Sequence, residues 1–340
     1  MATKADPQTI WSELYLGDCK EWLRDREASS LHAVVTDPPY GMIEYSKPHL
    51  QKLRAGKGGV WRIPPSIGGS KRQPLPRFTV LTPKDTSALF RFFVEWGTVL
   101  RPALVPGAHV FVASSPLLSH LVSRAMVRVG FEKRGEIVRL VRTLRGGDRP
   151  KGAELEFPDV SAMPRSCWEP WLIFRKPLEG TLAENLRKWE TGGLRRPRSK
   201  VPFTDVIFSR RTPRGEKRIA PHPSLKPQHF LRTLISAALP LGRGVVLDPF
   251  AGSGSTLAAC QALGYDAIGV ESDLDYVQMA VSAIPKLAAL DIEMDHLVSS
   301  NGVGEPHTQD PDTQDSPPAS QYRICESMPS LYGVNLHVAR

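Results

Sequence analysis

The chain alternates short apolar runs with amphipathic stretches, a pattern that predicts an α/β fold. Runs rich in β-branched or aromatic residues predict strands at 31–36, 109–113, 137–141, 171–174, 245–247 and 267–270. Apolar positions at helical spacing predict helices at 86–100, 116–129, 230–239, 255–263 and 274–290. We therefore expect a mostly parallel sheet with helices on both faces.

Two basic segments interrupt this alternation. Residues 41–84 hold nine Lys or Arg against one acid and are rich in Gly and Pro, which predicts a long basic loop insertion. Residues 180–220 hold eleven Lys or Arg against four acids. The whole chain carries a net charge of +9, and its concentration in these segments favours binding to a polyanion such as nucleic acid. A merely solvated surface is the alternative interpretation.

The end of the chain has a different composition. From 291 to 340 there are eight acids and two arginines, and Ser, Thr, Gln, Pro and Asp dominate from about residue 297. This composition cannot bury much apolar surface, so residues 297–340 are predicted to form a disordered acidic tail.

The remaining composition excludes several classes of protein. The chain has 340 residues and is 41% hydrophobic, yet no apolar run approaches the length of about 18 residues that a membrane helix needs. The first residues lack an apolar signal region, so a cytoplasmic location without membrane contact is expected. The four cysteines form no CxxC pair, which predicts neither a metal site nor a disulfide scaffold.

A glycine-rich loop follows the predicted strand at 245–247. Residues 247–256 read Leu-Asp-Pro-Phe-Ala-Gly-Ser-Gly-Ser-Thr, and such glycines let backbone N–H groups approach a ligand at the start of a helix. The next predicted strand leads to Glu271, where a carboxylate can accept both hydroxyls of a ribose. The loop is therefore a candidate nucleoside-binding site, although a plain tight turn would explain its glycines equally well.

Three nucleoside ligands can be compared at this loop. No lysine follows Gly254, which disfavours a triphosphate, and Leu257 stands where a dinucleotide fingerprint has a glycine. Asp248 at the strand tip would repel a pyrophosphate but would suit a cationic ammonium group. S-adenosylmethionine has both that ammonium and a ribose.

A second candidate site, Asp37-Pro38-Pro39-Tyr40, follows the predicted strand at 31–36. Two prolines end the strand and remove two backbone donors, so this corner presents acceptors. Asp37 and the Pro38 carbonyl can hold both hydrogens of a nucleobase amine, and Tyr40 offers a face on which the base stacks. A simple strand terminator is the alternative.

Three blocks together resemble the β-class DNA amino-methyltransferases, which methylate N6 of adenine or N4 of cytosine. They are Thr-Asp-Pro-Pro-Tyr-Gly at 36–41, His-Pro-Ser-Leu-Lys-Pro at 222–227 and the glycine loop at 247–256. Their order, with the catalytic corner first and the cofactor loop late, is the circular permutation that defines this class. The resemblance implies the Rossmann-like fold of S-adenosylmethionine-dependent methyltransferases.

The resemblance also implies roles for individual residues. The target base would be bound at Asp37, Pro38, Pro39 and Tyr40. The cofactor would be bound at Lys226, Asp248, Phe250, Gly252, Gly254, Thr256 and Glu271. Residues 1–296 would form the catalytic domain, and 180–220 would be its target-recognition segment. No metal ion would be bound.

The implied reaction transfers a methyl group from S-adenosylmethionine to the amine of a base flipped out of double-stranded DNA. In this family, aspartate at the position of Asp37 is associated with adenine N6 as the target, so adenine N6 is favoured over cytosine N4. An RNA methyltransferase and a noncatalytic DNA-binding protein are the alternatives. A homodimer and a cognate restriction endonuclease are partners compatible with the resemblance.

Overall fold

The strands of the protein form one large sheet and one small one. In a computed structural model, the described residues are 10–38, 66–67, 70–71, 83–141, 150, 152–162, 164–222, 224–292 and 334–338. The large sheet contains β1 (Ser12–Leu16), β2 (Leu31–Thr36), β5 (Leu104–Ala113), β6 (Glu132–Leu140), β7 (Trp168–Arg175), β8 (Val206–Phe208), β9 (Val245–Asp248), β10 (Asp266–Glu271) and β11 (Val334–Val338). The small antiparallel pair contains β3 (Ser66–Ile67) and β4 (Ser70–Lys71).

The large sheet has the order β11-β1-β10-β9-β2-β5-β7-β6-β8. All its neighbours are parallel except that β7 runs antiparallel to both β5 and β6. This confirms the predicted mostly parallel sheet. The predicted strands coincide with observed ones, whereas the short strands β1, β8 and β11 were not predicted from their sequences.

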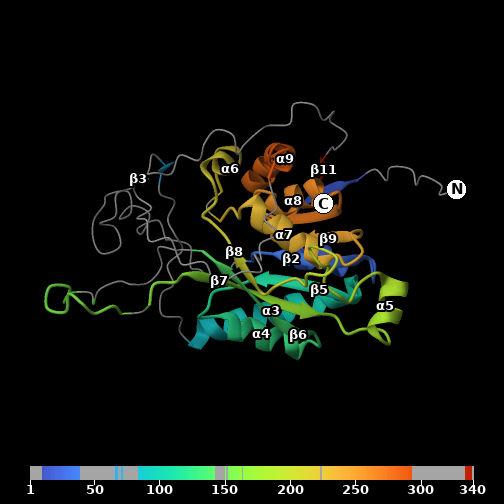
Figure 1. The fold of residues 1–340 in the computed structure, drawn as a ribbon, viewed down its shortest axis with the longest axis horizontal. Helices are drawn as coiled ribbons and strands as arrows, with labels where there is room; N and C mark the ends of the chain where they lie inside the picture. The colour runs from blue at the N-terminus through green and yellow to red at the C-terminus, as the bar shows by residue number, and fades with distance from the viewer. Residues whose placement is uncertain are drawn as a thin grey trace.

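Helices cover both faces of the sheet. They are α1 (Cys19–Arg24), α3 (Pro83–Ala103), α4 (Ser119–Arg128), α5 (Leu182–Trp189), α6 (Arg214–Ile219), α7 (Gln228–Ala238), α8 (Ser255–Leu263) and α9 (Leu274–Ala288). One face carries α3 and α4, and the opposite face carries α7, α8 and α9 (Figure 1). Among the described helices, none has both the length and the apolar character that crossing a membrane would need.

The hydrophobic core lies between these layers. Its largest fully buried side chains include Phe93 and Trp96 of α3, Phe111 of β5, Trp171 of β7 and Phe230 of α7. The buried strands read as nearly continuous apolar runs, as expected when helices cover both faces of a parallel sheet. The core therefore holds the central strands rigidly up to the points where they end.

The centre of the sheet contains a topological switch point between β2 and β9. From β2 the chain continues through α3 to β5 on one side, and from β9 it continues through α8 to β10 on the other. The helices α3 and α8 lie on opposite faces of the sheet (Figure 1), an arrangement in which open α/β sheets bind ligands at the carboxyl ends of the strands, here β2 and β9.

Part of the tail that was expected to be disordered forms a strand. Residues 334–338 form β11, which pairs in parallel with β1 at the sheet edge. The His337 ring stacks on Tyr15 with centroids 4.6 Å apart. The expectation of disorder is therefore wrong for these five residues, because an edge strand offers hydrogen bonds that composition alone does not reveal.

The structure describes one of the two basic segments in part and the other in full. Of the expected insertion at 41–84, the described residues are β3, β4 and the first two residues of α3. The segment at 180–220 is described throughout and contains α5, β8 and α6.

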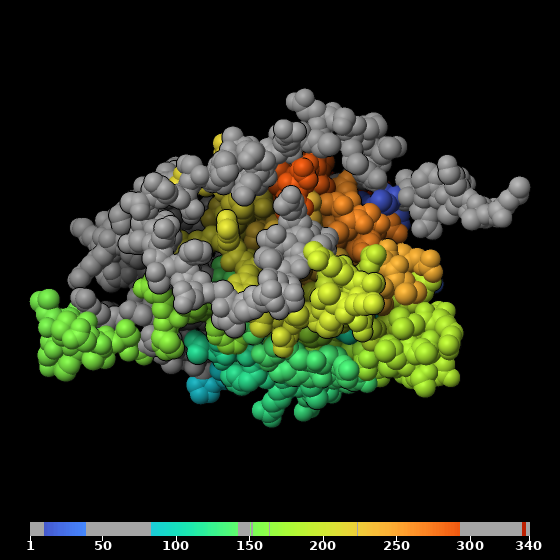
Figure 2. Space-filling view, in the orientation of Figure 1, coloured from blue at the N-terminus to red at the C-terminus, as the bar shows by residue number. Residues whose placement is uncertain are grey.

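Between β6 and β7, residues 152–162 project from the body of the molecule with Leu155 95% exposed (Figure 2).

Candidate active site

The two predicted sites meet at the switch point. Asp37 directly follows β2 and Asp248 is the last residue of β9, and these strands pair in parallel. The Thr36 hydroxyl donates a buried 2.7 Å hydrogen bond to Asp248 Oδ1. Residues more than 200 positions apart in the sequence are thereby brought to one edge of the sheet.

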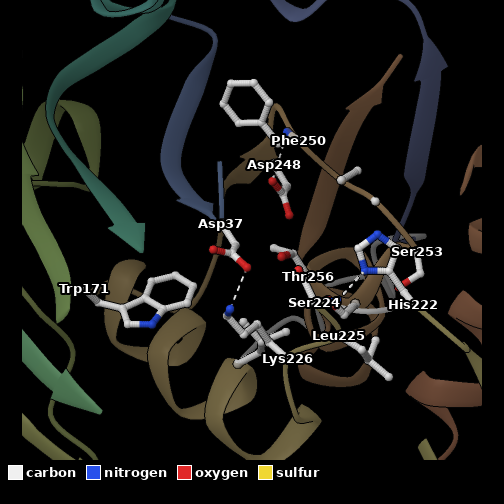
Figure 3. Close-up of a pocket in the computed structure, with 14 residues that line it drawn as sticks. Asp37, Trp171, His222, Ser224, Leu225, Lys226, Asp248, Phe250, Ser253 and Thr256 are labelled. Carbon is white, nitrogen blue, oxygen red and sulfur yellow. Dashed lines mark hydrogen bonds and ion pairs between the residues drawn. The ribbon is translucent and has the colours of Figure 1, made fainter. Parts of the chain in front are cut away.

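A cavity opens beside these strand ends. Its walls come from the end of β2, β7, the 222–226 segment, α7 and the glycine loop with the start of α8, and it holds about 380 Å³ including the part open to solvent. Asp37, Lys226 and Trp171 lie toward one side, and His222 and Ser253 lie toward the other (Figure 3). The cavity thus joins the acidic corner to the glycine loop.

The glycine loop depends on left-handed backbone conformations. Gly252 has φ 51° and Gly254 has φ 76°, values that favour glycine. A Cβ on Gly254 would lie 2.5 Å from Ile284 Cγ1, and one on Gly252 would lie 3.3 Å from His222 Nε2. Glycines are therefore needed here for backbone shape and for close packing, and the loop leaves room where side chains would otherwise stand.

Glu271 ties the end of β10 to this loop. Its Oε2 accepts a 2.8 Å hydrogen bond from the Gly252 N–H, and its Oε1 accepts from the N–H groups of Ser272 and Asp273. The carboxylate is consequently fixed next to the loop. The Ser272 hydroxyl also donates to Oε1 at 3.4 Å, whereas Oε2 accepts one bond, from Gly252, so Oε2 keeps a lone pair for a ligand hydroxyl.

Asp248 carries an unusual carboxyl group. Burial raises its pKa to about 6, although hydrogen bonds from Thr256 and Thr36 act in the opposite direction. The Phe250 N–H also donates to its Oδ1 at 3.2 Å. The site therefore holds a poorly solvated carboxylate, which a cationic ligand would stabilise in its ionised form.

Two carboxylates and two cations form a chain beside the corner. Lys226 Nζ lies 2.6 Å from Asp37 Oδ2 and 3.2 Å from Glu169 Oε1, and Arg139 donates to Glu169 Oε2 at 2.9 Å. Burial acts to lower the pKa of Lys226, but the adjacent carboxylates of Asp37 and Glu169 raise it overall. Burial likewise opposes the ionised form of Glu169, yet Lys226 and Arg139 hold its pKa below the usual range. The cluster therefore consists of charged groups that balance one another at neutral pH.

His222 stands against the glycine loop. Its Nδ1 accepts a 3.2 Å hydrogen bond from the Ser224 N–H, and its ring meets Tyr276 edge-on with centroids 4.4 Å apart. Burial lowers the pKa of His222, which favours the neutral ring with its proton on Nε2. The imidazole therefore serves as a wall of the cavity.

Most of the predicted site residues come together. Six of them line the cavity, namely Asp37, Lys226, Asp248, Phe250, Gly252 and Thr256. Glu271 contacts the loop through Gly252, Gly254 directly precedes α8, and Pro38 is buried next to Asp37 in the chain. Pro39 and Tyr40 lie outside the described residues. Lys226 was expected to contact the cofactor; in the structure it lines the cavity and its ammonium pairs with Asp37.

Four residues of the site were not predicted. His222 belongs to the block at 222–227, but its side chain had no assigned role there. Glu169 and Trp171 lie on β7, and Arg139 lies opposite Glu169 on β6. For Arg139 and Glu169 the available signal was a charged residue among apolar neighbours, at 137–141 and 168–174, because such a residue can remain buried only if it is paired. Among the described residues, no cluster of three or more His, Cys, Asp or Glu could hold a metal ion.

Known proteins share this sequence pattern and fold. The model of the DNA methylase family N6_N4_Mtase matches residues 31–282. The type II methyltransferase M.HindIII of Haemophilus influenzae is 25% identical over 298 residues, covering 80% of this chain and 94% of that protein.

Two solved structures have the same fold. The Thermus thermophilus protein TTHA0409, described as a DNA modification methylase, matches with TM-score 0.52 and 20% identity, over 82% of this chain and 96% of that one. The cytosine-N4-specific PvuII DNA methyltransferase matches with TM-score 0.51 and 14% identity, over 80% of this chain and 86% of that one. These likenesses confirm the predicted fold.

Proposed function

This chain belongs to the DNA methylase family, and we propose that it methylates the exocyclic amine of a base flipped out of double-stranded DNA, with adenine N6 as the preferred target. The methyl donor is S-adenosylmethionine. The observation that carries the proposal is the cavity shared by Asp37 and the glycine loop, because methyl transfer requires donor and acceptor sites to face each other.

The cofactor half of the cavity fits S-adenosylmethionine. Gly252 and Gly254 leave room for close approach to the backbone, Asp248 offers a buried carboxylate to a cation, and Glu271 is fixed where it can accept ribose hydroxyls. Phe250 and Thr256 complete this part of the lining. The bound cofactor supplies a methyl carbon made electrophilic by the adjacent sulfonium.

The corner half would hold the target amine. Asp37 and the Pro38 carbonyl would each accept one amine hydrogen, which turns the nitrogen lone pair out of conjugation with the ring. The N–C bond forms as the S–C bond breaks, the sulfur takes the bonding electron pair, and a proton then leaves the methylated nitrogen for solvent. In this proposal Pro39 and Tyr40 support the flipped base, with stacking on Tyr40 worth about 1–3 kcal/mol.

The basic segments suit a DNA partner. Residues 180–220 and 41–84 carry net charges of +7 and +8 by count of Lys, Arg, Asp and Glu, and neutralised phosphates provide most of the nonspecific affinity for DNA. We assign target recognition to 180–220 within a catalytic domain of residues 1–296. Adenine is preferred over cytosine because of Asp37, and N4 of cytosine is the second candidate target.

Incubation with radiolabelled S-adenosylmethionine and unmethylated duplex DNA, followed by digestion and nucleoside chromatography, tests the function. We expect label in N6-methyl-2′-deoxyadenosine from the DNA and none in RNA of matched composition. The Asp37→Ala variant should lose at least about 100-fold in transfer while still binding DNA, because it lacks the acceptor for the amine. Label in N4-methyl-2′-deoxycytidine would overturn the adenine assignment, and no transfer to any DNA would overturn the function.

A further inference from the structure

Lys226 lies between two carboxylates of the site. Its Nζ is 2.6 Å from Asp37 Oδ2 and 3.2 Å from Glu169 Oε1, and all three side chains are less than 20% exposed (Figure 3 shows the contact with Asp37). A short motion of the flexible lysine chain would place the ammonium fully on Glu169. Lys226 Nζ is therefore within ion-pair distance of both carboxylates and lies closer to Asp37.

Glu169 has acceptor capacity to spare. Its Oε1 is buried and receives no hydrogen bond of good geometry from the described residues, although Lys226 Nζ is close by. Its Oε2 accepts from Arg139, so the carboxylate cannot swing away to follow the lysine. Glu169 is consequently a fixed anion with an underused oxygen facing Lys226.

Arg139 is itself held in place. Its Nε donates to Ser209 Oγ at 3.0 Å, another nitrogen donates to the Arg210 carbonyl at 3.3 Å, and its guanidinium lies over the Phe230 ring at 4.9 Å. Ser209 and Arg210 directly follow β8 in the segment assigned to target recognition. The anchor of Glu169 is thus attached to that segment.

The location of Lys226 conflicts with the chemistry proposed for Asp37. During methyl transfer the target nitrogen gains positive charge, which an ionised Asp37 stabilises and a neighbouring ammonium opposes. We propose that Lys226 is a positioning residue that occupies Asp37 in the free protein and moves to Glu169 when the target amine binds. This inference rests on the proposed function and adds Glu169 and Arg139 to its machinery.

The charge balance of the cluster provides a double-mutant test. Glu169→Gln removes the second position of Lys226 and leaves an excess positive charge beside Asp37, so methyl transfer in a single turnover should fall about tenfold. Lys226→Met leaves two carboxylates without their shared cation and should also slow transfer. The double variant restores neutrality and removes the competitor for Asp37, so it should transfer faster than Glu169→Gln alone.

Binding gives a readout that does not depend on catalysis. The duplex carries the sequence that the wild type methylates, either intact or with the target amine replaced by hydrogen, as purine or pyrimidin-2-one. The wild type should prefer the intact duplex, and Glu169→Gln should reduce that preference several-fold because the amine must displace a trapped lysine. Loss of a merely structural contact would weaken binding of the protein to both duplexes equally.

A matched control lies on the same two strands. Glu132 and Arg175 form the equivalent cross-strand pair at the other end of the β6–β7 ladder, away from the cavity. Glu132→Gln should leave transfer and amine preference unchanged. Should Glu169→Gln fold poorly in a thermal melt, the single variant Glu169→Asp replaces it outside the cycle. This variant keeps the charge but withdraws it from Lys226, so both transfer and amine preference should show an intermediate defect.

Each outcome decides between the claims. A double variant as slow as Glu169→Gln, or an unchanged amine preference in Glu169→Gln, overturns the inference while an active wild type keeps the proposed function. A wild type that methylates no DNA overturns the proposed function and this inference with it.

Discussion

The hydroxyl of Thr36 donates a hydrogen bond to the carboxylate of Asp248, and the two residues are 212 positions apart in the chain. This bond joins the last residue of β2 to the last residue of β9 at the switch point of the sheet. It fixes the distance between the corner that would hold an amine and the loop that would hold the methyl donor. Catalysis by positioning depends on such a rigid spacing.

Gly254 should not tolerate a side chain. Gly254→Ala would place a Cβ 2.5 Å from Ile284 Cγ1 at a φ of 76°, so we expect a stability loss of about 1–3 kcal/mol and weaker binding of S-adenosylmethionine. Denaturant unfolding and calorimetric titration measure the two effects. Gly193→Ala is the control, because its Cβ would meet only Leu182 at 4.0 Å. Equal behaviour of the two variants would contradict the role of Gly254.

Asp248 should make stability fall as the pH rises. Burial raises its pKa from 3.8 to about 6, so the folded protein holds this proton more tightly than the unfolded chain does. Its contribution is therefore most favourable below about pH 4 and is lost as the pH rises to about 6. Unfolding free energies of wild type and Asp248→Asn between about pH 4 and 8 isolate this effect, and a pH-independent difference between them would refute it.

The same carboxyl group should control cofactor binding. Above about pH 6 the ionised Asp248 attracts a cationic ligand, so the affinity for S-adenosylmethionine should increase from about pH 5 to 7 in the wild type. Asp248→Asn should bind more weakly at neutral pH and lose most of that pH dependence. Isothermal titration calorimetry measures both, and an Asn variant that keeps the wild-type profile would argue against this contact.

Glu216 is a second buried acid with a raised pKa. Burial raises the pKa to about 7, while the N–H of Gln228, which donates to Oε2 at 2.9 Å, and nearby Arg232 and Arg139 favour the ionised form. Stability from Glu216 is present below its ordinary pKa and is lost as the pH rises toward about 7. Glu216→Gln should therefore have a flatter stability profile between about pH 5 and 8 in chemical unfolding, and an unchanged slope would count against this assignment.

β11 should stabilise the sheet edge without affecting catalysis. Deleting residues 334–340 removes the parallel pairing with β1 and the His337 ring from Tyr15, so the free energy of unfolding should fall by about 1–2 kcal/mol. Methyl transfer should persist, because β1 and β10 separate β11 from the cavity strands. His337→Ala, which removes only the ring contact, should have a smaller effect. A large loss of transfer with intact folding would indicate a role for this strand in the site.

Local sequence was sufficient to predict an element of the fold where a single segment carries the whole signal for that element. The β-branched run at 31–36 and the apolar pattern at 255–263 predicted β2 and α8 with their observed boundaries, because burial on both faces and helical periodicity are local properties. The Asp-Pro-Pro-Tyr corner and the glycine loop were likewise recognisable as candidate sites, since prolines and glycines mark the unusual backbone that each of them needs. Their joint presence identified the family, and the alternation of elements gave the fold class.

Only the tertiary structure decided which distant groups meet. The short strands β1, β8 and β11 have no strong local signal, and their pairing depends on edges that other segments provide. The family resemblance suggested Lys226 as a cofactor contact. Its ion pairs could not be read from the sequence: the ammonium lies between Asp37 and Glu169, and Arg139 holds Glu169 from the neighbouring strand. Charge pairing acts through space, so the partners of a buried charge follow from strand order and register, which no single segment encodes.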